Sequence, residues 1–163
     1  MKKIIITLIV VLTTMTAFAQ TQTNTYMETI EKDKEILISI VKEMAESFTG
    51  TQSTKHWAED ALWFDIPPIA VKGKEKSREI FENAFRQLKS IDVEILSIEV
   101  VINGDMGIVC SVQRWNIAKE NADKSPLMVR QTNCFERRNG EWKLIHQHDS
   151  TPAGGNWDGK ILD

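Results

Sequence analysis

One acidic and one basic side chain of this sequence, Asp65 and His148, could transfer a proton near neutral pH. Asp65 follows Trp63 by two places in an apolar stretch, where a carboxylate loses hydration, gains a higher pKa and becomes a better base. His148 could be its partner, because imidazole titrates near neutral pH. Such a pair in an apolar pocket suits an isomerase, dehydratase or cyclase that needs no cofactor. Alternatively, Asp65 is a turn residue that accepts a backbone hydrogen bond before Pro67.

A hairpin near the end of the chain would position the histidines. Asn139-Gly140 is typical of a two-residue turn, since both of its central positions need φ > 0. The register of this turn sets Asn133 opposite His146 and Gln131 opposite His148. Side chains alternate across a strand, so all four should lie on the pocket face. There Gln131 or Asn133 could donate to a ligand oxygen, or Asn133 could simply bond to His146.

The preceding strand should add to the same face. We expect residues 106–118 to pair with the next strand so that Gln113 and Trp115 line the pocket. Cys110 would then lie opposite Cys134 on the outer face, either as a disulfide or as two free thiols. A slip of one residue would move the whole strand to the other face.

Tryptophans could supply the apolar walls of the pocket. Trp57, Trp63 and Trp115 are candidates, and flat aromatic walls suit a small apolar molecule with a carbonyl or hydroxyl group. The alternative is that they fill the core. His146 and His148 are two apart on one strand, but the sequence fixes no third ligand, so we expect no metal site.

The start of the chain is typical of a secretory signal. Lys2-Lys3 precedes the apolar run Ile4–Val11, and Ala17-Phe18-Ala19 forms a cleavage site. The run is shorter than the roughly 20 residues of a membrane span, so we expect cleavage rather than anchoring. The sequence therefore predicts a periplasmic or secreted bacterial protein, with a signal over 1–19 and no stable membrane insertion after cleavage.

Composition and pattern predict one α+β domain. The chain has 163 residues and a net charge of -3 without a basic block, which argues against a nucleic-acid partner. A flexible N-terminus (20–26) would precede a domain over 27–152, and the tail 153–163 could cover the pocket or contact a second subunit. The hydrophobic period changes from 3.6 to 2 near residue 91, which favours helices on one face of an antiparallel sheet. We expect helices at 27–48 and 74–88, a short strand at 62–66, and long strands at 92–102, 106–118, 127–138 and 141–150.

Three motifs resemble one known family. They are Trp57-Ala58-Glu59-Asp60-Ala61, then Phe64-Asp65-Ile66-Pro67 with the later Gly73, and finally the segment from Gly140 to His148. Over residues 28–152 the chain resembles the SnoaL-like and ketosteroid-isomerase-like branch of the nuclear-transport-factor-2-like superfamily. The resemblance implies a conical α+β barrel, in which a curved antiparallel sheet wraps a long N-terminal helix around an apolar pocket, often as a homodimer.

The resemblance also implies roles for single residues. Asp65 is similar to the general base of the ketosteroid isomerases, and Gln131 falls near their acidic oxyanion donor. Tyr26 is the only tyrosine and stands at the start of the long helix, whereas those enzymes carry a tyrosine within it, so steroid isomerisation itself is not expected. Three functions stay open: an acid–base enzyme of isomerase or lyase type, a non-catalytic small-molecule binding module, and a dimeric assembly domain.

Overall fold

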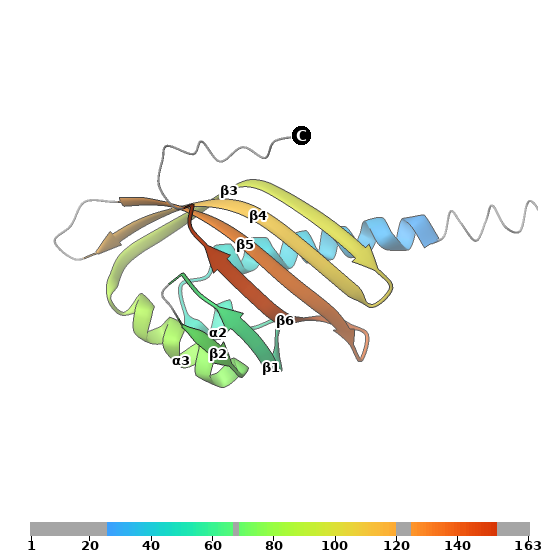
Figure 1. Ribbon diagram of the computed structural model, residues 1–163, viewed down its shortest axis with the longest axis horizontal. Coiled ribbons are helices and arrows are strands. Elements are labelled where there is room, and N and C mark those ends of the chain that lie inside the picture. Colours follow the sequence, from blue (N-terminus) through green and yellow to red (C-terminus); the bar gives the residue numbers. More distant parts are fainter. Residues whose placement is uncertain (1–25, 67–68, 120–124, 153–163) are drawn as a thin grey trace, which may run out of the picture. The chain divides into compact units, whose positions relative to one another are not determined.

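The computed structural model describes residues 26–66, 69–119 and 125–152 (Figure 1). The predicted signal, the residues before 26 and the predicted tail lie outside this part of the chain. Residues up to Glu35 and residues from Ile36 form two compact units. In the first unit residues 26–35 are helical, and in the second unit residues 36–45 are helical. Within the described ranges, no helix is long and apolar enough to cross a membrane.

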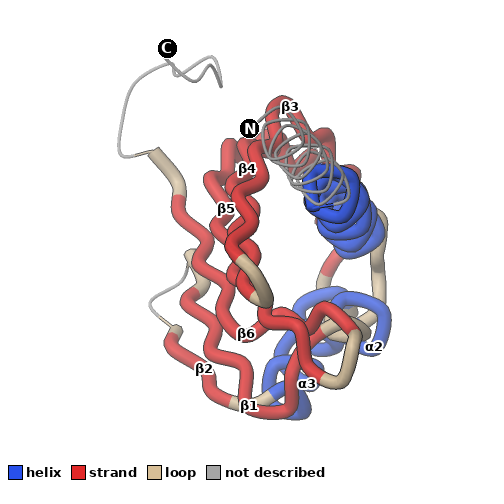
Figure 2. The backbone as a smooth tube through the Cα atoms, turned by 90° about the vertical axis from the view of Figure 1, so that its right-hand side faces the viewer, coloured by secondary structure: helices blue, strands red, loops and turns tan. Residues whose placement is uncertain are grey.

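The second unit is built on one sheet of six strands. The strand order is β2-β1-β6-β5-β4-β3, and neighbouring strands are antiparallel except for the parallel pair β1–β6. Figure 2 shows the sheet bending, with the short helices on its concave side. The elements are α2 (Gly50–Ser53), β1 (Trp57–Phe64), β2 (Ala70–Lys72), α3 (Lys74–Phe85), β3 (Leu88–Asn103), β4 (Met106–Lys119), β5 (Ser125–Arg138) and β6 (Glu141–Ser150).

The predicted change from helices to strands is confirmed, with shifted boundaries. The first strand begins at Trp57 rather than near residue 62, and the third begins at Leu88 rather than near 92. Trp57 is almost fully buried and pairs with Leu144 of β6. A large aromatic side chain fits a pleated, buried surface, so the first strand extends back to Trp57.

The core lies between the sheet and the helical segment 36–45. Leu37, Ile40 and Val41 are buried at helical spacing against apolar side chains of β1, β4, β5 and β6. The approach is close at Gly107 of β4, where an added Cβ would lie 2.5 Å from Cδ1 of Leu37. Glycine thus lets this part of the helix approach the sheet.

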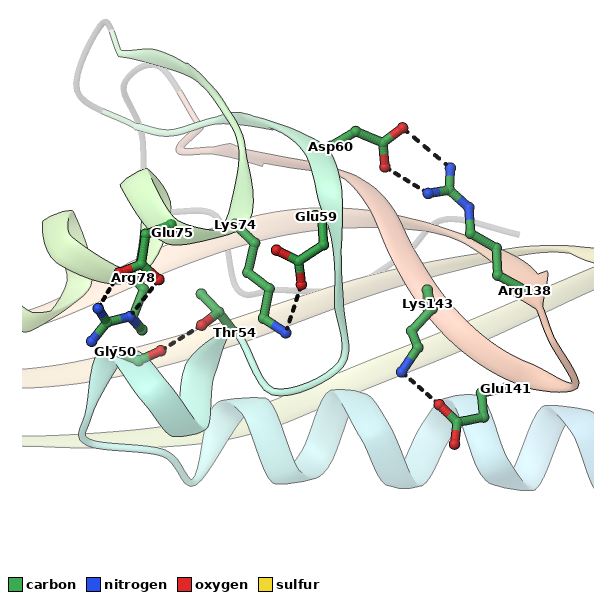
Figure 3. Close-up of polar contacts among 10 residues, drawn as sticks. All are labelled: Gly50, Thr54, Glu59, Asp60, Lys74, Glu75, Arg78, Arg138, Glu141 and Lys143. Atoms are coloured by element: carbon green, nitrogen blue, oxygen red, sulfur yellow. Dashed lines mark hydrogen bonds and ion pairs between the residues drawn. The ribbon is translucent and has the colours of Figure 1, made fainter.

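The short helices α2 and α3 touch through a second glycine. An added Cβ at Gly50 would clash with the backbone carbonyl of Arg78 and lie 2.8 Å from Cγ of Glu82. The Gly50 N–H donates to Oε1 of Glu82 at 2.9 Å. The Thr54 hydroxyl donates to the Gly50 carbonyl at 2.8 Å (Figure 3). This contact fixes α2 against α3, and both helices contribute walls to the cavity described below.

Exposed ion pairs connect elements that are distant in the sequence (Figure 3). Arg138, at the end of β5, donates to Asp60 of β1 at 2.6 and 3.5 Å. Lys74, at the start of α3, lies 3.5 Å from Glu59 of β1. Exposed pairs of this kind each contribute about 0–1 kcal/mol, so burial of apolar side chains dominates stability here.

Candidate functional site: a buried carboxylate network beside an apolar cavity

The last hairpin follows the predicted register only near its turn. Asn139 and Gly140 have positive φ angles of 53° and 82°, and Phe135 pairs with Leu144 as expected. Beyond that point the register shifts, so that Cys134 rather than Asn133 lies opposite His146. One extra residue in β6 causes the shift, and such a bulge reverses the faces of all later side chains.

The bulge places the two histidines on the outer side of the sheet. His148 is exposed and His146 is half-buried, with its Nδ1 3.0 Å from the Leu62 carbonyl oxygen. Both imidazole rings contact the ring of Phe64 edge-on, at 5.1 and 6.0 Å between centroids. The predicted pairs Asn133–His146 and Gln131–His148 are therefore wrong. The position of His148 gives its predicted catalytic role no support, and that role stays a prediction.

Two side chains that sequence reasoning missed take the inner positions. Gln147 is 3% exposed opposite Asn133, and Asp149 is 2% exposed opposite Gln131. The break in alternation at Leu144-Ile145, where two apolar residues are adjacent, is the signal that could have suggested a bulge here.

The middle hairpin keeps the predicted face but shifts by two residues. Gln113 and Ser111 are buried on the inner side, and Ser111 pairs with Gln131. An even shift preserves the face, because side chains alternate with a period of two. Cys110 and Cys134 pair with other residues and are free thiols, so their predicted direct opposition is wrong.

Asp149 is held by three N–H donors on the inner face. Its Oδ2 accepts from Nε1 of Trp63 at 2.9 Å and from Nε2 of Gln147 at 2.6 Å, and its Oδ1 accepts from Nε2 of Gln131 at 2.9 Å. Burial raises the pKa of Asp149, and the three donors act in the opposite direction by favouring the charged form.

The network continues from Asp149 across β5 and β4. Oε1 of Gln131 accepts from Nδ2 of Asn133 at 2.7 Å and from Nε2 of Gln113 at 3.1 Å. Oε1 of Gln113 in turn accepts from Nε1 of Trp115 at 2.7 Å. The predicted site residues Gln113, Trp115, Gln131 and Asn133 are thus brought together in one chain of hydrogen bonds that ends at Asp149.

A cavity of about 80 Å³, counted as space for water-sized molecules, lies against this network. Its polar wall consists of Gln113, Gln131 and Gln147, and the hydroxyls of Ser47 and Ser53 line another part, 2.7 Å from each other. This volume admits several waters or a small organic group. The remaining lining residues are Met44, Ala45, Phe81, Phe85, Ile91, Val93 and Trp115.

Two of the predicted aromatic residues lie behind this wall rather than in it. Trp63 stacks on Phe81 with ring centroids 4.5 Å apart, and Trp57 meets both rings edge-on. Phe81 lines the cavity, whereas Trp57 and Trp63 are not among the lining residues. They fix the position of Phe81 and, through the Trp63 indole, that of Asp149.

Asp65 combines features of both sequence interpretations. As a turn residue, it accepts the Ile66 N–H through Oδ1 at 2.7 Å. Burial, and secondarily the charge of Asp149, raises the pKa of Asp65 to about 6, although the Ile66 hydrogen bond lowers it. The parallel register of β1 and β6 ends with Phe64 opposite His148, one residue before Asp65 and Asp149. The charge of Asp149 is close enough to act on Asp65.

The described residues contain no group of three or more His, Cys, Asp or Glu side chains arranged to hold a metal ion. The groups described above are two carboxyls, several amides and an apolar cavity. A half-buried carboxyl with a pKa near 6 is mostly ionised at neutral pH and is a stronger base than an ordinary aspartate.

Residues 37–154 match the model of the SnoaL-like domain, and the chain belongs to this family. No curated protein matches its sequence. Fold comparison finds a Salmonella enterica protein of the nuclear transport factor 2 superfamily, with TM-score 0.70 and 10% identity over 81% of this chain and 99% of the other.

Two other solved structures carry suggested activities. A proposed dehydratase of the NTF2-like family from Streptomyces avermitilis has TM-score 0.68 and 15% identity over 76% of this chain and 99% of its own. A proposed ketosteroid isomerase from Parabacteroides distasonis has TM-score 0.58 and 18% identity, and the match covers 72% of this chain and 86% of the other. At such identities these structures show the fold alone. They confirm the predicted nuclear-transport-factor-2-like α+β cone, here with a sheet that is curved but not closed.

Proposed function

We propose that this protein binds a small, mostly apolar molecule with a carbonyl or hydroxyl group and performs acid–base chemistry on it without a cofactor. The reaction class is isomerisation, dehydration or cyclisation, and Asp65 is the base. The observation that carries the proposal is the half-buried Asp65, whose pKa is raised to about 6 by burial and by the charge of Asp149. Asp149 is in turn bonded to Gln131 and Gln147, which line the apolar cavity.

In this mechanism Asp65 removes a proton from the carbon next to the substrate carbonyl, and the electron pair moves into the resulting enolate. The protonated Asp65 then returns the proton to another carbon in an isomerisation, or to a β-hydroxyl group that leaves as water in a dehydration. Oδ2 of Asp65 is the oxygen for this step, because Oδ1 already accepts the Ile66 N–H. The negative charge of Asp149 raises the pKa of Asp65 and so makes it a stronger base. Burial of Asp65 itself removes water from the carboxylate, which preserves its basicity.

A binding module without turnover is the second candidate, and one observation favours it. Asp65 is not among the residues that line the cavity, and its hydrogen bond to Ile66 fits a turn residue. In that case the cavity would hold a ligand through Phe81, Trp115 and the glutamines, and Asp65 would only shape the loop.

Deuterium exchange separates the two candidates. A panel of cyclic ketones and enones in D₂O is followed by NMR for label at the α-carbon, with the unmodified protein and with Asp65→Asn. The enzyme proposal expects exchange above buffer that disappears in Asp65→Asn, while circular dichroism shows that the variant is folded. Exchange that persists in the variant would exclude Asp65 as the base.

Export and self-association are further parts of the proposal. The basic and apolar start of the chain supports export to the periplasm or medium, and the mass of the mature protein from an expressing bacterium tests it. A homodimer would cover the exposed Val101, Met106 and Ile108 at the β3–β4 end of the sheet. Light scattering after size exclusion tests this part, and a monomer at every concentration would contradict it.

A further inference from the structure

We infer that the cavity continues along β3 into an outer groove, so that the preferred ligand has a polar head in the cavity and a neutral alkyl tail in the groove. This inference rests on the proposed function of the same cavity and narrows its substrate class. It is carried by two hollows that share Ala45 and Val93 in their walls.

The cavity is polar at its floor and apolar at its mouth. Gln113, Gln131 and Gln147 line it and are buried, with exposed fractions of 2%, 7% and 3%. The apolar lining residues are half-buried and therefore nearer to solvent, and they include Met44, Ala45, Phe85, Ile91 and Val93. A ligand that enters between these apolar side chains places its polar group at the floor and leaves its apolar part at the mouth.

A second hollow, the outer groove, meets the cavity at this mouth. It holds about 300 Å³ of space for water-sized molecules. Its walls are Lys42, Ala45 and Glu46 of the helical segment 36–45, and Val93 and Ile95 of β3. Ala45 and Val93 line the cavity as well. Because the side chain of Ala45 is a single methyl group, little material separates the cavity from the outer groove at this position.

The inner face of β3 connects the two hollows. Side chains alternate across a strand, so Ile91, Val93 and Ile95 share one face, and Val93 and Ile95 pair with Trp115 and Gln113 of the cavity wall. Ile91 lines the cavity, Val93 lines both hollows, and Ile95 lines the outer groove. These four steps along the strand span about 13 Å. The three side chains therefore form an apolar row that leads out of the cavity.

The helical segment supplies the opposite wall of the groove. Lys42, Ala45 and Glu46 follow each other at spacings of three and four residues from Lys42, so they lie on one face of the helix. Lys42 and Glu46 are exposed and their formal charges cancel. Their methylene groups can cover an alkyl chain while the charged ends stay in water. These walls suit a neutral tail better than an ionised one.

A series of 4-alkylcyclohexanones, from 4-methyl to 4-pentyl, tests the inference on the unmodified protein. The carbonyl and the alkyl group of these probes lie at opposite ends of the ring. Dissociation constants and the methyl signals of Ile91 and Ile95 are followed by protein-observed NMR. Each methylene that is partly or fully buried should raise the affinity about two- to fourfold, so we expect the 4-pentyl compound to bind at least about tenfold more tightly than the 4-methyl compound.

The methyl signals locate the tail. Every member of the series should shift the Ile91 signals, because Ile91 lines the cavity, whereas the Ile95 signals should respond only to the longer tails. Equal affinity across the series, or no binding of any member, would overturn the inference. A gain in affinity that leaves the Ile95 signals unchanged would overturn it too, since the tail would then lie elsewhere.

Ala45→Leu should close the passage between the two hollows. The ratio of 4-pentyl to 4-methyl affinity should then fall to about threefold or less, and an unchanged ratio would contradict the passage. Ala84→Leu is the matched control and should keep the ratio, because Ala84 is exposed on α3 and lines neither hollow. If Ala45→Leu does not fold, the Ile95 signals of the unmodified protein still decide.

Deuterium exchange reads the proposed function separately on the same ketones. A preference for long tails without exchange would contradict catalysis and leave this inference intact. Exchange that is accompanied by equal affinity across the series would support the proposed function and overturn the inference.

Discussion

Asp65→Asn should stabilise the protein at neutral pH and have little effect below about pH 4. The pKa of Asp65 is raised from 3.8 to about 6, first by burial and then by Asp149, against the lowering effect of the Ile66 N–H. A difference of one pH unit between folded and unfolded pKa equals about 1.4 kcal/mol, so the full displacement equals about 3 kcal/mol. Because solvent screens this partly exposed carboxyl, we expect about half, roughly 1.5 kcal/mol.

The sign follows from proton linkage. The folded protein binds the Asp65 proton more tightly than the unfolded chain does, because its folded-state pKa is the higher one. The stability contributed by this carboxyl is therefore complete below about pH 4 and is lost as the pH rises through about 6. Asparagine carries no charge to desolvate, and its Oδ1 can still accept the Ile66 N–H that Asp65 now accepts at 2.7 Å.

Urea unfolding of both proteins at pH 4 and pH 8 measures this effect. We expect nearly equal stability at pH 4 and a gain of roughly 1.5 kcal/mol for Asp65→Asn at pH 8, about 5 °C in Tm for a chain of this size. The exposed Asp92→Asn is the matched control and should show no such gain. A difference between Asp65→Asn and the unmodified protein that is the same at both pH values would refute the raised pKa.

Three further substitutions test the geometry. His148→Ala should keep at least about half of any exchange activity, since its side chain is exposed on the outer face; loss of activity would restore the predicted role of this histidine. Gly50→Ala should lower stability by about 1–3 kcal/mol in urea unfolding, because its Cβ meets the backbone of Arg78, and an unchanged midpoint would contradict the close contact of α2 and α3. Asp60→Ala should lower the urea midpoint only slightly, and 1 M salt should abolish the difference, because its pair with Arg138 is exposed.

The sequence was sufficient to predict the fold because its strongest signals are local. Apolar residues at helical spacing, such as Leu37 and Val41, lie in the core as expected, and Asn139-Gly140 forms the predicted turn. The family match and the solved structures agree with the α+β cone predicted from these patterns. Strand starts were less predictable, because Trp57 suits either a short helix or a strand and tertiary burial decides between them.

The site was less predictable, because a shift of one residue in the pairing of β5 and β6 decides which side chains face the cavity. A single bulge in β6 exchanges His148 for Asp149 on the inner face, and nothing in the turn at Gly140 specifies a bulge several residues later. The pairing of β4 with β5 differs from the predicted register by two residues. Because side chains alternate with a period of two, Gln113 still lies on its predicted face. Parity, rather than distance along the chain, decides whether a predicted site residue reaches the cavity.

Asp149 and Asp65 differ in how many hydrogen bonds their carboxyls accept, and this difference suggests a structural role for one and a chemical role for the other. Asp149 accepts three N–H donors, which favour its charged form against the raising effect of burial, and it suits the role of orienting Trp63, Gln131 and Gln147. Asp65 receives the Ile66 N–H on one oxygen, and no other described donor is recorded for its carboxyl. A carboxylate that is desolvated and incompletely bonded destabilises the fold, and a site under selection for packing alone would favour an apolar side chain there. A desolvated, incompletely bonded carboxylate is explained if it works as a base, which is why we propose Asp65 rather than the better-bonded Asp149 as the catalytic candidate.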